Sequence, residues 1–340
     1  MYAVKSNFYN LSEFNEILKD SIGYTDFKNI SRIAVKNINQ IRKKSINIKI
    51  LKTKNIIVPN AREAKSFIEI KKGILVDGLV CYNINYTTKE NCEQLYNYEW
   101  YSPFSVIIYV NQNNFSNRYK FYTFVESSSI DIIKDEYIDG ICKIIISTGY
   151  SENSYLVEEK ETIYEEVSGV ISIDELNSLS KEKTEFLKLY TDIFLIDLNS
   201  FKGRLKKIIS FNNCENIISI RNIRNQYLSD YINYDGELNL SNKVCIDGFM
   251  IYSIKYETYD CNEEYLIKNL LRPLTISFSK GNNIEKINKN NVCFYTLDSN
   301  IYSFNKRYLI IRSVYFSFVK LEAYIYGEGF MGGSEKWTGI

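Results

Sequence analysis

The stretch VDGLVCYNINY, Val76–Tyr86, recurs 170 residues later as IDGFMIYSIKY, Ile246–Tyr256. The matching residues are every second one, which is the set that lies on one face of a β-strand. The repeat therefore predicts two related strands that share one face. The matched positions are Val76 and Ile246, Gly78 and Gly248, Val80 and Met250, Tyr82 and Tyr252, Ile84 and Ile254, and Tyr86 and Tyr256.

The similarity continues on both sides of these strands. At the same offset, Pro103-Phe104 lies over Pro273-Leu274, and further on Phe121-Tyr122-Thr123 resembles Phe294-Tyr295-Thr296. Upstream, residues 10–15 match 172–177 at an offset of about 162, which predicts one insertion of about eight residues near 233–242. We therefore divide the chain into a first repeat (1–150), an acidic linker (151–170) that forms a solvated linker or helix face, a second repeat (171–327) and a Gly-rich C-terminal tail (328–340).

Within each repeat we expect one or two short helices packed on strands. Apolar spacing predicts helices at Leu11–Ile22 and Ile173–Tyr190, the second after a Ser172-x-x-Glu175 capping box, and a short helix after Asn60. The segments after Gly73 and Lys243 alternate like strands. The predicted fold is mainly β with some α, as two tandem β-sandwich or barrel-like units.

Four residues of the repeated motif have structural interpretations. Gly78 and Gly248 fall in mid-strand, where glycine marks a bulge or a close backbone approach. Pro103 and Pro273 are expected at strand starts, where no ladder N–H is needed.

Composition excludes several classes of function. Lys plus Arg number 42 against 41 Asp plus Glu, and this balance is unlike a protein that binds nucleic acid or anionic lipid. The absence of histidine excludes Ser-His-Asp and Cys-His catalysis and His-ligated metal sites. We expect no secretion signal in residues 1–10 and no membrane span.

No residue pattern indicates catalysis. The carboxylate pairs Asp135-Glu136 and Glu263-Glu264 are adjacent residues, as in solvated loops, and GEGFMGG at Gly327–Gly333 lacks the GK[ST] of a phosphate-binding loop. We predict no catalytic residue, no cofactor and no metal. Aromatic residues make up 15% of the chain and include 29 tyrosines, which favour strands.

Two features point towards association between molecules. Cys92 and Cys261 follow the two matched strands in polar loops, and each is either a site of intermolecular disulfide cross-linking or an unpaired surface thiol. The tail carries Phe330, Met331 and Trp337 among glycines, and is either a docking peptide for a neighbouring subunit or a flexible terminus.

The order V-x-G-x-x-x-x-x-I-x-Y, a polar loop and then P-F-S resembles the SPOCS domain of SipL-like spore-coat proteins of clostridial endospore formers. The residues that carry the resemblance are Val76, Gly78, Ile84, Tyr86, Pro103, Phe104 and Ser105, with Ile246, Gly248, Ile254, Tyr256, Pro273 and Leu274 in the second repeat. No LysM-type region follows Tyr326, and Leu274 replaces the phenylalanine. The resemblance implies a sporulation protein that is made in the mother-cell cytoplasm and deposited on the spore surface, in the coat or exosporium.

Together these features predict a structural protein that self-assembles into a layer or filament of the spore surface. Its expected partners are copies of itself and other spore-envelope proteins. Two alternatives remain open. The first is an adaptor that recruits other coat proteins without polymerising, and the second is a glycan-binding surface module that uses exposed Tyr and Trp as stacking platforms.

Overall fold

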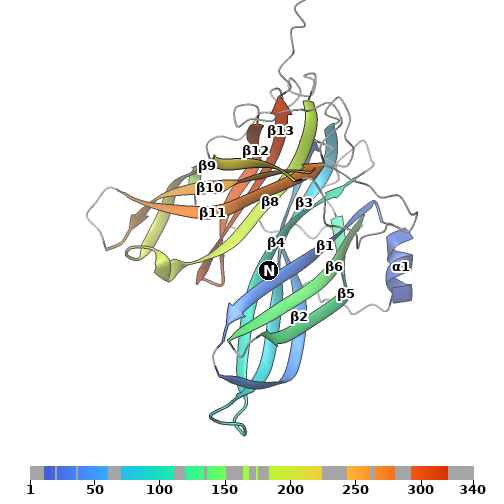
Figure 1. Ribbon diagram of the computed structural model, residues 1–340, viewed down its shortest axis with the longest axis vertical. Helices are drawn as coiled ribbons and strands as arrows, with labels where there is room; N and C mark the ends of the chain where they lie inside the picture. The colour runs from blue at the N-terminus through green and yellow to red at the C-terminus, as the bar shows by residue number, and fades with distance from the viewer. Residues whose placement is uncertain are drawn as a thin grey trace, which may run out of the picture.

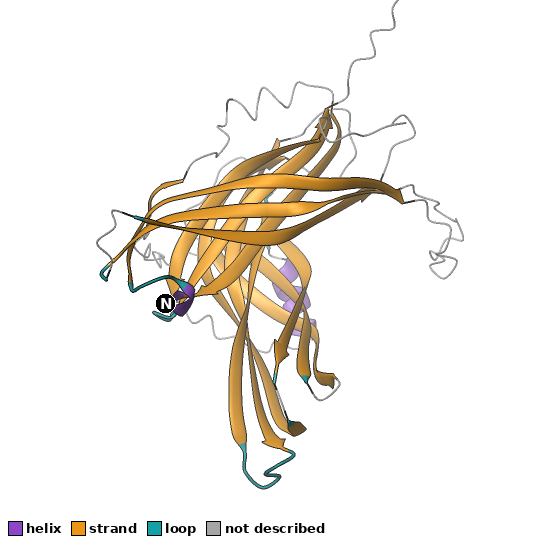
Figure 2. Ribbon diagram, turned by 60° about the vertical axis from the view of Figure 1, so that its left-hand side comes forward, coloured by secondary structure: helices purple, strands orange, loops and turns teal. Residues whose placement is uncertain are grey.

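The chain forms long antiparallel β-strands with very little helix (Figures 1 and 2). The computed structural model describes residues 11–19, 21–35, 37–59, 70–110, 119–133, 136–150, 164–167, 174, 184–223, 243–260, 265–279 and 292–320. Their elements are α1 (Leu11–Lys19), β1 (Gly23–Ala34), β2 (Ile38–Pro59), β3 (Ile70–Thr88), β4 (Tyr96–Tyr109), β5 (Tyr119–Ile133), β6 (Tyr137–Tyr150), β7 (Tyr164–Val167), β8 (Thr184–Asp197), the 3-10 helix η1 (Leu198–Ser200), β9 (Leu205–Ile223), β10 (Lys243–Thr258), β11 (Leu266–Ser279), β12 (Val292–Phe304) and β13 (Tyr308–Lys320).

The strands form four sheets, two from each half of the chain. The first half contributes β1-β6-β5 and β2-β3-β4, and the second contributes β8-β13-β12 and β9-β10-β11, with the short β7 added in parallel to β9. The order of strands is the same in both halves. The mainly-β prediction is therefore confirmed, and the strands fall roughly into two halves.

The irregularities of the strand ladders also recur in the same places. The β2–β3 ladder skips Leu51 opposite Gly78, and the β9–β10 ladder skips Ile218 opposite Gly248. Three further shifts agree in the same way: those between Ile38/Gln40 and Ile41/Lys43 recur at Glu257/Thr258 and Lys255/Tyr256, and that between Val125/Ser127 recurs at Thr296/Asp298. The shift between Phe318/Lys320, at the end of the β8–β13 ladder, has no counterpart among the β1–β6 pairs. A β-bulge is a specific feature of a strand, so this agreement defines which residues are repeat counterparts, meaning that they hold the same position in the two halves.

The registers place the length differences between the halves more finely than the sequence does. Repeat counterparts are 163 residues apart in β1 and β8, 167 in β2 and β9, 170 in β3 and β10, and 171 in β6 and β13. The second half thus gains four residues before β9, where η1 lies, and three before β10. The prediction of one insertion near 233–242 was wrong, and the Phe121 match to Phe294 is two residues out of register.

Each half buries its main core between its own two sheets. Val76, Val80, Tyr82 and Ile84 lie in the first core, and Met250, Tyr252 and Ile254 of β10 lie in the second. Ile246, the match of Val76, is also fully buried. The alternating set found in the sequence is therefore the inner face of β3 and of β10. A third apolar layer lies between the halves, where the outer face of β2-β3-β4 packs on the outer face of β8-β13-β12.

Several local predictions differ from the structure. The predicted helix Ile173–Tyr190 was wrong over 184–190, which belong to β8, because pairing with β13 overrides the helical spacing of its apolar residues. The first helix ends at Lys19 rather than Ile22, and part of the predicted linker is the strand β7. The helix expected after Asn60 lies outside the described residues.

Candidate interaction surface

The contact between the halves is an apolar interface that surrounds a buried ion cluster. The first half supplies side chains from β2, β3 and β4, and the second half supplies side chains from β8, β12 and β13. The fully buried members include Val58, Leu75, Leu79, Ile310, Val314 and Phe316. Removal of this much apolar surface from water holds the two halves together.

Arg312 lies at the centre of this interface and is 0% exposed. Its Nε donates to Asp77 Oδ2 of the first half at 3.1 Å, and its Nη1 donates to Asp298 Oδ2 of its own sheet. Lys54 of the first half reaches the other oxygen of Asp298 at 2.6 Å. The guanidinium thus pairs with one carboxylate from each half. Both ion pairs form only when the two halves are held in the correct relative position.

Neighbouring charges set the protonation of this cluster. Burial alone would raise the pKa of Asp298, but the positive charges of Arg312 and Lys54 outweigh it and hold that pKa below its ordinary value. Burial disfavours the charged guanidinium, yet Asp77 and Asp298 raise the pKa of Arg312 above its ordinary value. Asp298 and Arg312 are therefore both ionised at neutral pH.

The outer face of β9-β10-β11 is the repeat counterpart of the face that β2-β3-β4 buries. We call it the terminal face and define it by Ile218, Phe249, Ile251, Leu271 and Pro273. Leu271 is 64% exposed and Ile218 is 53% exposed. Their counterparts Tyr101 and Leu51 pack in the interface between the halves. A surface of the same kind is thus covered in one half and exposed to solvent in the other.

The terminal face carries its own charge compensation. Asp247 is the counterpart of Asp77, and both accept a hydrogen bond from a hydroxyl on the adjacent strand, Thr275 at 3.3 Å and Ser105 at 2.7 Å. Asp247, however, pairs with Arg221 of β9 at 2.6 Å. The side-chain hydrogen bond from Arg221 lowers the pKa of Asp247. The carboxylate therefore needs no cation from a second sheet.

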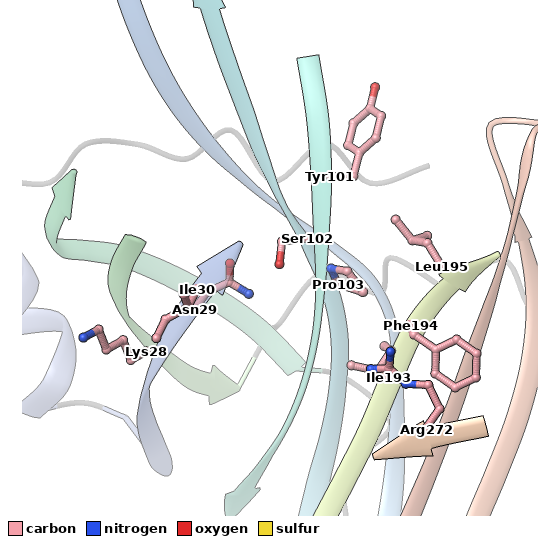
Figure 3. Close-up of a pocket in the computed structure, with 10 residues that line it drawn as sticks. All are labelled: Lys28, Asn29, Ile30, Tyr101, Ser102, Pro103, Ile193, Phe194, Leu195 and Arg272. Atoms are coloured by element: carbon pink, nitrogen blue, oxygen red, sulfur yellow. The ribbon is translucent and has the colours of Figure 1, made fainter. Parts of the chain in front are cut away.

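A pocket lies where the edge strands β1, β4, β8 and β11 meet (Figure 3). It has a volume of about 490 Å³, and the ionisable groups that line it are Lys28, Tyr101 and Arg272. Arg272 stacks over the Phe194 ring at 4.8 Å and lies 3.6 Å from Asp192. The residues that line the pocket include no pair of carboxylates for general acid–base catalysis.

The two glycines of the motif lie beside the bulges, as predicted. A Cβ on Gly78 would meet Lys49 O at 2.6 Å and the ring of Phe104, and a Cβ on Gly248 would meet the carbonyl oxygen of Asn216. Only glycine therefore fits these backbones without displacement.

The other motif residues lie in or beside the cores. Phe104 is buried and packs against Phe27, with the two rings tilted and their centroids 4.9 Å apart. Tyr86 packs at the edge of the first core and Tyr256 is buried in the second. Pro103 and Pro273 lie in mid-strand, which corrects the expected strand starts. They are tolerated there because β4 and β11 are edge strands, on which one row of N–H groups is not used by the ladder.

The residues proposed for association are only partly described. Cys92 is exposed in the loop after β3, and its Sγ lies 3.4 Å from Asn39 Nδ2. Cys261, Phe330, Met331 and Trp337 lie outside the described residues. The proposals of cross-linking and of tail docking therefore remain predictions.

Sequence reasoning missed Arg312, Asp77 and the terminal face. The available signal was the nearly continuous apolar run Leu75–Tyr82, interrupted only by Asp77 and Gly78, because such runs are typical of strands buried on both faces. The same signal is present at Ile246–Tyr252.

Comparison with protein families, curated proteins and solved structures finds no match to this chain. No helix among the described residues is long and apolar enough to cross a membrane. The same residues hold no group of three or more Cys, Asp or Glu side chains placed to bind a metal ion.

Proposed function

We propose that this chain is a structural protein that associates with copies of itself through the terminal face. The resemblance of its repeat to the SPOCS domain suggests the setting, a coat or exosporium layer of the bacterial spore, where other envelope proteins would be further partners. The role is one of assembly rather than of chemical conversion.

The observation that carries the proposal is the exposure of Leu271 and Ile218 on a face whose repeat counterpart is buried. β10 has the sequence of a strand covered on both sides, IDGFMIY, yet among the described residues no second sheet packs on its outer side. An exposed apolar sheet face of this kind marks a site of protein–protein contact. Two similar units in tandem give repeated association a ready template.

Electron microscopy and light scattering of the purified full chain test this function. We expect growth in mass with concentration and ordered filaments or layers. A chain that stays monomeric at high concentration would contradict self-assembly. If such a monomer instead bound other coat proteins, the adaptor function would be supported in its place.

A further inference from the structure

We infer that the terminal face of one molecule binds the outer face of β1-β6-β5 of the next molecule, in the way that the two halves of one chain pack on each other. This inference rests on the proposed function and specifies its contact. We call the second surface the leading face and define it by Ile30, Arg32, Tyr137, Asp139 and Ile141.

The internal interface supplies the template for this contact. Within the chain, Leu79 and Tyr101 of the first half pack against Ile193 and Tyr308 of the second. The counterparts of Leu79 and Tyr101 are Phe249 and Leu271, which belong to the terminal face.

On the other side of the template, the counterparts of Ile193 and Tyr308 are Ile30 and Tyr137, which belong to the leading face. Ile30 is 62% exposed and Tyr137 is also exposed. Both sides of the internal contact thus recur on the two outermost sheets, where the described residues do not pair them with each other.

The helix α1 covers a different part of the β1-β6-β5 sheet. Phe14 of α1 is fully buried and stacks on Phe124 at 4.8 Å. The counterpart of Phe124 is Tyr295, which packs with Ile57 and Ile70 of the first half. At that end of the β1-β6-β5 sheet, α1 therefore covers the position that the first half covers on the equivalent sheet of the second half. Phe124 and Asp26 both lie opposite Ile145 of β6. Asp26 is four residues from Ile30 along β1, a distance of about 13 Å, so the contact of α1 lies about that far from Ile30.

The charges of the two faces fit a reversible contact. Ile141 is the counterpart of Arg312, so the contact between molecules lacks the buried cation of the internal interface. Arg32 instead donates to both oxygens of Asp139 at 2.6 Å within the leading face, and Arg221 pairs with Asp247 within the terminal face. The charged residues that define the two faces are therefore paired within their own surface, which avoids the cost of burying these charges unpaired.

The positions of the two faces favour an open chain of molecules. β9-β10-β11 and the sheet that carries α1 lie on opposite sides of the molecule (Figure 1). A contact between two different faces is heterologous, and it continues indefinitely unless the rotation closes a ring.

Two substitutions and their mixture test this inference by sedimentation velocity. Leu271→Asp places a charge on the terminal face and Ile30→Asp places a charge on the leading face, so that each variant keeps only the other face intact. We expect each variant alone to be monomeric, with association weakened at least about tenfold. An equimolar mixture should form one-to-one dimers and nothing larger, because one intact face of each kind remains.

Ile267→Asp is the matched control. Ile267 lies on the same outer face of β11 and is 60% exposed, but its counterpart, Asn97, is exposed rather than buried between the halves. We expect this variant to assemble like the wild type. Circular dichroism checks that all three variants are folded.

Other outcomes would overturn the inference. If Ile30→Asp assembles normally while Leu271→Asp does not, two terminal faces pair with each other and the head-to-tail contact is wrong, although self-association stands. If Ile267→Asp is as disruptive as Leu271→Asp, the contact does not follow the internal template. A wild-type chain that never associates would instead contradict the proposed function itself.

Discussion

Asp77 and Asp247 hold the same position in the two halves, but Asp77 pairs with Arg312 of the other half and Asp247 pairs with Arg221 of its own sheet. The surrounding sheets have the same strand order, and each carboxylate has a hydroxyl partner at the same place on the next strand. Asp77 therefore lies on a sheet face that the other half covers, and Asp247 lies on the equivalent face of the second half, where its cation comes from the same sheet.

The first prediction concerns the stability of the interface between the halves. Asp77→Asn leaves the buried Arg312 with one carboxylate instead of two and should lower the free energy of unfolding by about 3–5 kcal/mol. Asp247→Asn should have a much smaller effect, since its ion pair is solvent-exposed. Urea unfolding of both variants measures the difference, and equal losses would show that Arg312 does not depend on Asp77.

Stability should fall in acid through Asp298. Its pKa is lower in the folded chain than the ordinary value of about 3.9, so ionised Asp298 stabilises the fold above about pH 4. This contribution is lost as pH falls through the lowered folded value. Asp298→Asn should be less stable at neutral pH and should lose less stability between pH 5 and pH 2. Urea midpoints across this range give the answer, and parallel profiles for variant and wild type would refute the assignment.

Alanine at either bulge glycine should destabilise the chain. The added Cβ of Gly78→Ala or Gly248→Ala meets backbone oxygen, which cannot move aside as a flexible side chain can. We expect a loss of about 1–3 kcal/mol in each case. Gly149→Ala is the control, because a Cβ there meets nothing within 4 Å. Thermal unfolding should separate the two classes, and three equal melting temperatures would argue against the close approach.

Buried tyrosines at repeat counterparts make related hydrogen bonds of different strength. Tyr82 OH donates to Asn29 Oδ1 at 2.9 Å, whereas Tyr252 OH donates to Asp192 Oδ2 at 2.6 Å. Loss of a bond to a buried carboxylate costs about 1.5–3 kcal/mol, and loss of a neutral bond costs about 1 kcal/mol. Tyr252→Phe should therefore destabilise more than Tyr82→Phe in urea unfolding. The reverse order would mean that Asp192 is satisfied without the tyrosine.

The duplication could be predicted from sequence, because the matched residues of β3 and β10 lie on the inner faces of two sheets with the same strand order. The β8 strand could not, since the spacing of Leu187, Tyr190 and their neighbours fits a helix, and only pairing with β13 makes it a strand. The interface between the halves could not be predicted either. Asp77 and Arg312 are 235 residues apart, and each looks like a surface charge until the sheets are stacked.

The terminal face illustrates why sequence alone underdetermines the surface. Val76–Tyr86 and Ile246–Tyr256 have nearly the same pattern of apolar residues, yet among the described residues a second sheet packs on the outer side of β3 and not of β10. The apolar pattern of a strand therefore does not show which sheet covers its outer side.

Sedimentation velocity of the wild-type full chain over a concentration series, with Leu271→Asp beside it, tests the central claim most directly. The account predicts that the wild type sediments faster as its concentration rises and that the variant remains at the monomer mass of 39.9 kDa. A wild type that sediments as the same monomer at every concentration would contradict it.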